Sequence, residues 1–221
     1  MEYIDIDMAC RGKLSDQKLM AMVWQQISSL NEDLDKSEQE FLANYAFQDL
    51  KYYLLYRFGL LNLDDETASY ELCRRILRNE YIVNELVNEW FNWWIIKWRQ
   101  RVRLVFNESD QKSGELDKEN LDDIIKKIPK KILNKLRKEV MAELIRQNEV
   151  CSLNVISDFI LKAVLNDLIN EYGRDGALRV LVTNMTKVRL RIISKIMEIS
   201  NTNTPLVILK VRINPSNQGI P

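Results

Sequence analysis

Four of the five tryptophans lie close to four cations in residues 90–106, WFNWWIIKWRQRVRLVF. The cations alternate with other residues and are Lys97, Arg99, Arg101 and Arg103. Lys and Arg neutralise phosphates while indole rings pack on bases or sugars, so the segment suits a nucleic-acid groove. Aromatic residues beside positive charge also suit a membrane interface. A third interpretation is a core helix whose exposed face is cationic.

Two further basic groups follow in the C-terminal half. Residues 126–138 hold seven cations within thirteen positions, and a third group lies at residues 187–195. The backbone phosphates of a nucleic acid attract such basic groups whatever its base sequence. The alternative is a solvated helix face balanced by nearby acids such as Glu139 and Glu143. The candidate nucleic-acid-binding residues, taken over all three groups, are Lys97, Arg99, Arg101, Arg103, Lys126, Lys127, Lys130, Lys131, Arg137, Lys138, Lys187, Arg189 and Arg191.

The formal net charge of zero conceals a division of the chain. Residues 1–96 carry 9 basic and 17 acidic side chains, a net of −8, and residues 97–221 carry 23 basic and 15 acidic, a net of +8. Such asymmetry predicts different partners for the two halves, or association of one half with the other. The alternative is that the charge difference between the two halves arose by chance and that folding intermixes their charges on the surface.

Most catalytic chemistry is not expected. Histidine is absent, which removes the commonest general base and metal ligand. The carboxylate pairs, such as Asp64–Asp65 and Asp122–Asp123, stand at expected helix starts, where they complement the helix dipole. Cys10, Cys73 and Cys151 are widely spaced and odd in number, so we expect three reduced, partly buried thiols. We expect no enzyme, no cofactor and no metal site.

The elements that position these residues are expected to be helices. Only 6 glycines and 4 prolines punctuate the chain, and apolar residues recur at helical spacing. Ser37 with Glu40 forms an expected capping box, while Gly59 and Gly173 stand where helices should end. The expected helices cover residues 15–30, 37–58, 66–106 (with a break near Asn79 or Asn92), 121–128, 130–147, 152–172 and 177–199.

The segment PLVILKVRINP near the C-terminus alternates like a strand, and a lone strand needs a partner. Residues 2–8, or a neighbouring chain, could supply it. Residues 97–106 also admit a strand, but the helical period of residues 90–98 favours a helix to Phe106. On that helix Trp94 and Trp98 face inward, whereas Arg99 and Arg103 point outward as the expected contacts.

The sequence therefore predicts a mainly α-helical, multi-helix bundle and leaves open a small β element formed by the terminal segments. Residues 1–106 form an acidic region, 107–117 a linker, and 118–221 a basic region. Because no signal-peptide pattern or long apolar run is present, we expect a cytoplasmic protein without integral membrane association.

The leading hypothesis for function is a non-enzymatic nucleic-acid-associated protein, an accessory or structural subunit of a nucleoprotein assembly. It would contact backbone through the C-terminal half and dock a protein partner or a second copy through the acidic half. The alternatives are a helical protein–protein scaffold without a nucleic-acid role and a protein that binds membrane surfaces.

Overall fold

The computed structural model describes residues 6–11, 14–30, 35–106, 125–126, 128–202 and 207–211, and most of these residues are in helices. The mainly α-helical prediction is confirmed. The helices are α1 (Ile6–Arg11), α2 (Leu14–Ser28), α3 (Lys36–Arg57), α4 (Asp65–Arg78), α5 (Glu80–Arg101), α7 (Lys130–Arg146), α8 (Leu153–Thr183) and α9 (Met185–Ser200). The strands are β1 (Val102–Phe106) and β2 (Val207–Val211).

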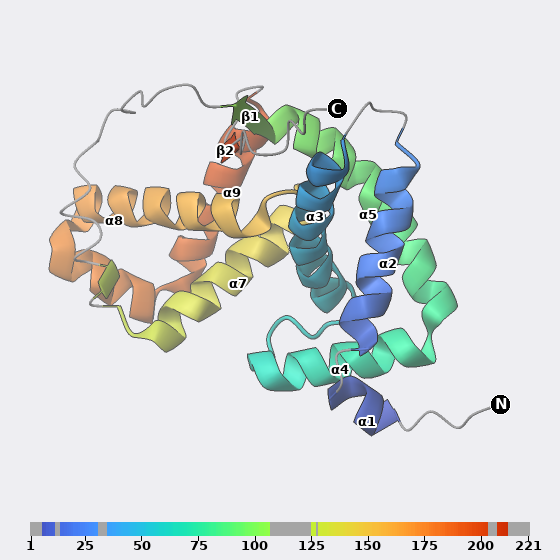
Figure 1. The fold of residues 1–221 in the computed structure, drawn as a ribbon. Coiled ribbons are helices and arrows are strands. Elements are labelled where there is room, and N and C mark those ends of the chain that lie inside the picture. Colours follow the sequence, from blue (N-terminus) through green and yellow to red (C-terminus); the bar gives the residue numbers. More distant parts are fainter. Residues whose placement is uncertain are drawn as a thin grey trace.

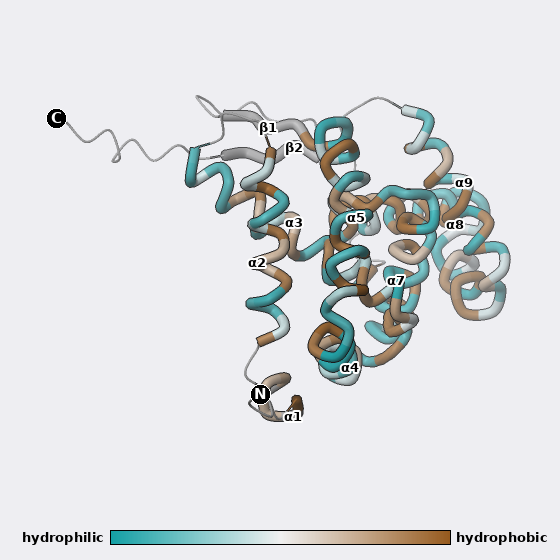
Figure 2. Tube along the Cα trace, turned by 90° about the vertical axis from the view of Figure 1, so that its right-hand side faces the viewer, coloured by the Kyte–Doolittle hydropathy of each residue, from teal (hydrophilic) through white to brown (hydrophobic). Residues whose placement is uncertain are grey.

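Helices α2, α3 and α5 stand side by side, α4 crosses beneath them, and α7, α8 and α9 pack together on the other side (Figure 1). Helix α3 contacts α7 and α8 and so joins the two groups. The helices alternate hydrophobic and hydrophilic stretches, as expected of amphipathic helices with one buried face (Figure 2). One hydrophobic cluster includes residues from α2 to α9, so the acidic and basic parts of the chain share a core. The expected linker at residues 107–117 lies outside the described residues.

The ends of α3 show how local sequence sets helix length. Its capping box is formed by Asp35 and Glu38: Glu38 N–H donates to the Asp35 carboxylate (2.8 Å), and Asp35 N–H donates to the Glu38 carboxylate (2.9 Å). The prediction of Ser37 and Glu40 in these roles is wrong, because an aspartate two residues earlier already accepts the bond. The expected stop at Gly59 is confirmed, with φ of 70° and the Leu60 N–H bonded to the Leu55 carbonyl at 2.8 Å.

Two other helix boundaries follow from single residues. Asn79 separates α4 from α5, as one of the two expected breaks. Gly173 interrupts α8 with φ of 69° and ψ of 175°, which confirms the expected stop there. The single helix expected over residues 177–199 is wrong, because Asn184 ends α8 and its side chain accepts a bond from Lys187 N–H (3.1 Å) at the start of α9.

The small β element has a different partner from the one expected. β2 confirms the C-terminal strand, but it pairs in parallel with β1, with Val102 opposite Val207 and Phe106 opposite Val211. β1 of the same chain therefore takes the place that residues 2–8 could have filled, and residues 6–8 are helical. Pairing with a neighbouring chain stays a prediction. The helix predicted through Phe106 ends at Arg101, because β-branched Val102 takes up extended geometry (φ −109°, ψ 126°).

The cysteines also differ from expectation. Cys10 of α1 and Cys73 of α4 form a disulfide with Cα atoms 5.6 Å apart, whereas Cys151 is a buried free thiol. The prediction of reduced thiols is thus wrong for the first two and confirmed for Cys151. The fold brings together two cysteines 63 residues apart, which their spacing in the sequence could not reveal.

Among the described residues, no helix combines the length and the apolar composition that crossing a membrane requires.

Candidate nucleic-acid interface

The tryptophans of α5 form part of the hydrophobic core. Trp90, Trp94 and Trp98 are buried, and the Trp94 and Trp98 rings stack with centroids 5.2 Å apart. Tyr45 of α3 meets the Trp98 ring edge-on at 4.9 Å. The core interpretation is confirmed for these three indoles, which leaves Trp93 as the one exposed tryptophan of the segment. Base stacking on the buried rings would require the core to open.

A buried carboxylate fixes this aromatic cluster to the C-terminal half. Asp49 of α3 accepts hydrogen bonds from the Trp94 indole N–H (2.9 Å), Ser152 N–H (2.7 Å) and Leu153 N–H (2.9 Å). The last two donors stand at the start of α8, so Asp49 acts as its cap from another helix. Burial raises the pKa of Asp49 to about 6, against the lowering effect of the three donors. Asp49 was not among the predicted functional residues, although an aspartate between Ala46 and Tyr53 on an apolar helix face was a visible signal.

Two cations of the tryptophan-rich segment turn inward to a second buried carboxylate, Glu149. Lys97 Nζ lies 2.7 Å from Glu149 Oε1, and Arg101 Nη2 lies 3.0 Å from the same oxygen. Arg101 also donates to the Thr202 carbonyl (2.6 Å) and is only 2% exposed. Burial alone would raise the pKa of Glu149, but hydrogen bonds from Arg101 and Lys97 hold it below its usual value.

This network positions the β element rather than a ligand. It joins the end of α5, the turn before α8 and the end of α9, from which β1 and β2 continue. Lys97 and Arg101 are therefore held by Glu149, while Arg99 is exposed on the same helix. Arg103 lies in β1, and its side chain is outside the described part of the structure.

The basic residues of α9 are matched by acids of neighbouring helices. Lys187 lies 3.1 Å from Glu171, with its ammonium 4.5 Å from the centre of the Tyr172 ring. Arg191 also pairs with Glu171, and Arg189 pairs with Glu139 of α7 at 2.7 Å. These ion pairs join α9 to α8 and α7, so their charge is largely neutralised within the fold.

The basic residues of α7 divide into two groups. Towards its middle, Arg137 pairs with Asp158 (2.8 Å), and Lys138 donates to the Leu63 carbonyl (2.7 Å) and pairs with Asp65 (3.2 Å). At its start, Lys130, Lys131 and Lys135 are exposed and have no acidic partner in the described part of the chain. Lys126 is exposed just before the helix, and Lys127 lies outside the described residues.

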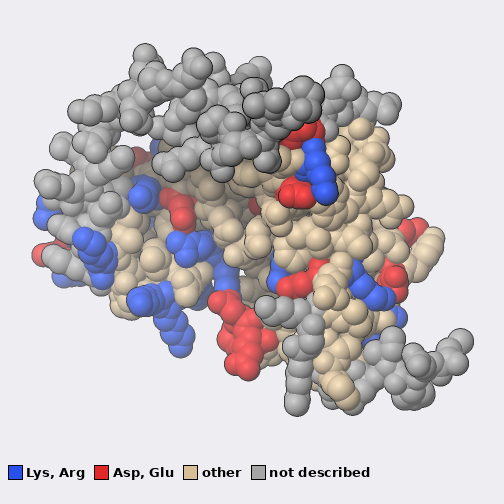
Figure 3. All heavy atoms as spheres, viewed as in Figure 1, with Lys and Arg blue, Asp and Glu red and all other residues tan. Residues whose placement is uncertain are grey.

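The start of α7 is also electropositive because of its backbone. Pro129 caps it without a side-chain hydrogen bond, and its first turn contains no acidic residue. Among the described residues the first N–H group of α7 with a backbone acceptor is that of Ile132, so the N–H groups of Lys130 and Lys131, together with the helix dipole, add to the charge of the lysines. We call Lys130, Lys131 and Lys135 the α7 lysine surface. Lys and Arg atoms gather over this side of the molecule, with Asp and Glu atoms among them (Figure 3).

The three basic groups thus have different surroundings in the fold. The group on α5 is partly buried against Glu149, and the group on α9 is paired with acids. The start of α7 has cations without an acidic partner among the residues that the structure describes. Within the described residues no group of His, Cys, Asp or Glu side chains could hold a metal ion. Comparisons with protein-family models, curated proteins and solved structures found no match to this chain.

Proposed function

We propose that this chain is a non-enzymatic, cytoplasmic, nucleic-acid-associated protein that binds the phosphate backbone through its C-terminal half. The observation that supports the proposal is the α7 lysine surface, three exposed lysines without an acidic partner among the described residues. They stand at a helix start that has no acidic residue and no side-chain cap. Phosphates would neutralise this charge and release condensed counterions, which provides affinity independent of base sequence.

We expect the α7 lysine surface to contribute most to binding, because cations of the other groups already pair with acids of the fold. A phosphate that approached Arg189 or Arg191 would have to displace Glu139 or Glu171. One that approached Arg101 would have to enter the core. Among the described residues no carboxylate has to leave the α7 lysines when they bind, so we expect their contribution to affinity to be largest.

The acidic half provides the proposed contact with a protein partner or with a second copy of the chain. One exposed apolar pair of this half lies on α5, where Trp93 and Ile96, three residues apart, are 44% and 46% exposed. Residues at this spacing share one helix face. This pair also favours the second candidate function, a helical scaffold without a nucleic-acid role. Light scattering after size exclusion distinguishes the two: the scaffold predicts oligomers lost in Trp93→Ser/Ile96→Ser, with no nucleic-acid affinity in either protein.

Fluorescence anisotropy with labelled duplex DNA and single-stranded RNA at low salt tests the proposal. We expect Lys130→Gln/Lys131→Gln/Lys135→Gln to weaken binding about tenfold or more, because each lost phosphate contact removes counterion release. Glutamine keeps helix propensity close to that of lysine, so α7 should remain folded.

The matched control removes the same charge from the acidic half, in Lys36→Gln/Arg75→Gln/Arg78→Gln. Its residues are exposed and stand at the ends of α3 and α4. Affinity close to that of the wild type is expected for this control. Equal losses in both triple variants, or no binding of the wild type to DNA or RNA, would contradict the proposal.

A further inference from the structure

Helix α1 contacts α2 and α4, and one covalent cross-link holds it against α4. This helix has six residues, too few for stability on its own, and Met8 within it is 69% exposed. None of its described side chains belongs to the hydrophobic core. It lies at the outer side of α4, beyond the bundle (Figure 1). The Cys10–Cys73 disulfide is what joins it to a buried residue of that helix.

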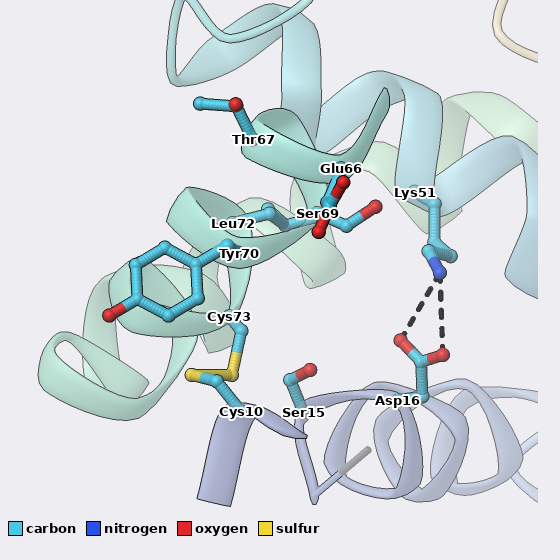
Figure 4. A pocket seen from close by; sticks show the side chains of 10 residues that line it. All are labelled: Cys10, Ser15, Asp16, Lys51, Glu66, Thr67, Ser69, Tyr70, Leu72 and Cys73. Atoms are coloured by element: carbon cyan, nitrogen blue, oxygen red, sulfur yellow. Dashed lines mark hydrogen bonds and ion pairs between the residues drawn. A yellow bond between two sulfur atoms is a disulfide. The ribbon is translucent and has the colours of Figure 1, made fainter. Parts of the chain in front are cut away.

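A cavity of about 610 Å³ gives access to this disulfide. Figure 4 shows both sulfur atoms at its wall, beside Ser15 and Tyr70, with the Lys51–Asp16 ion pair farther along. Cys10 is partly exposed, whereas Cys73 is 2% exposed in the buried face of α4. A small thiol that enters the cavity therefore meets the Cys10 sulfur as the accessible end of the bond.

We propose that the Cys10–Cys73 disulfide is a redox-controlled clamp that dithiol reductants open through this cavity, releasing α1 while the rest of the bundle stays folded. The first thiolate of the dithiol attacks Cys10 Sγ, the S–S bond breaks, and Cys73 leaves as a thiolate that takes up a proton. The second thiol of the reductant then attacks the sulfur bonded to Cys10 and releases the Cys10 thiolate, which is protonated. The reductant loses two electrons and two protons as it becomes a disulfide, and the two cysteines gain them.

The rest of the fold does not need this bond. The core cluster is built from residues of α2 to α9, and the links through Asp49 and Glu149 lie among α3, α5, α8 and α9. Reduction should therefore act locally: α1 detaches, and the face of α4 around Cys73 becomes open to solvent. Cys151 reports on the remainder, because it is buried beside the Asp49 network.

The experiment uses the full chain in native buffer with dithiothreitol, followed by N-ethylmaleimide and peptide mapping. We expect Cys10 and Cys73 to be alkylated after reduction and Cys151 to stay unmodified. Hydrogen exchange of residues 6–11 should become about tenfold faster or more on reduction, while exchange in α3 and α5 stays unchanged.

Cys10→Ser provides the second test, since it cannot form the disulfide and leaves the sequence of α4 unchanged. Its exchange pattern should equal that of the reduced wild type, and dithiothreitol should change it no further. Three results would each overturn the proposal: reduction that requires denaturant, alkylation of Cys151 together with loss of protection in α3 and α5, or unchanged exchange of α1 after reduction.

Discussion

Asp49 makes the stability of the fold depend on pH in a direction opposite to that of most carboxylates. Burial raises the pKa of Asp49 from 3.8 to about 6, so the Asp49 carboxyl group stays protonated to higher pH in the native state than in the unfolded chain. Between about pH 4 and pH 6 the native state therefore binds more protons, and the free energy of unfolding falls as pH rises. The stabilisation that protonated Asp49 contributes to the native state is fully present below about pH 4 and is lost as the pH rises through about 6. A shift of about two units corresponds to about 3 kcal/mol.

Urea unfolding of the wild type and of Asp49→Asn over this pH range isolates the effect, because asparagine does not ionise. We expect the wild-type free energy of unfolding, taken relative to that of the variant, to fall by about 3 kcal/mol from about pH 3.5 to pH 7. Trp94→Phe removes one donor to the carboxylate and should make the fall larger. A difference that is flat, or that rises with pH, would show that the donors at the start of α8 outweigh burial and would refute the reasoning.

Three further predictions concern single buried or strained positions. Arg101→Met should lower the free energy of unfolding by about 3 kcal/mol in denaturant titrations, because it removes one of the two cations that compensate the buried Glu149 carboxylate and leaves Lys97 as the other. Arg101→Met/Glu149→Met should recover part of this loss. Gly173→Ala should cost about 1–3 kcal/mol by thermal unfolding from its backbone conformation alone, since nothing lies within 4 Å of the added methyl group. Burial raises the pKa of Cys151 well above its usual value, so iodoacetamide should label it only as fast as the chain unfolds; rapid labelling of the native protein would contradict its placement.

Local sequence signals predicted the helices well where a single residue controls the backbone. Gly59 and Gly173 take up positive φ values that other residues rarely adopt, so their positions alone fixed two helix ends. Asn79 and Asn184 both end helices, but only the first was among the predicted breaks, as one of two alternatives with Asn92. The start of α3 was misassigned because two capping boxes overlap in sequence and only hydrogen bonding distinguishes them.

Long-range pairing could not be predicted from the sequence. Strand β2 pairs with β1, and the paired residues, such as Val102 and Val207, are 105 positions apart in the sequence. The disulfide joins two cysteines that are 63 positions apart. Charge pairing is equally non-local, since Glu149 neutralises cations about fifty residues away. The count of cations in the sequence therefore overstated the charge exposed to a ligand, and the structure leaves the start of α7 as the exposed part without acidic partners among the described residues.

The salt dependence of nucleic-acid binding measures the role of the α7 lysine surface. The slope of the logarithm of the binding constant against the logarithm of salt concentration counts the phosphates that the protein neutralises. If Lys130, Lys131 and Lys135 each neutralise one phosphate of duplex DNA, their replacement by glutamine should make this slope shallower by about 2.7. The control Lys36→Gln/Arg75→Gln/Arg78→Gln should keep the wild-type slope. An unchanged slope in the α7 variant would contradict the proposed interface.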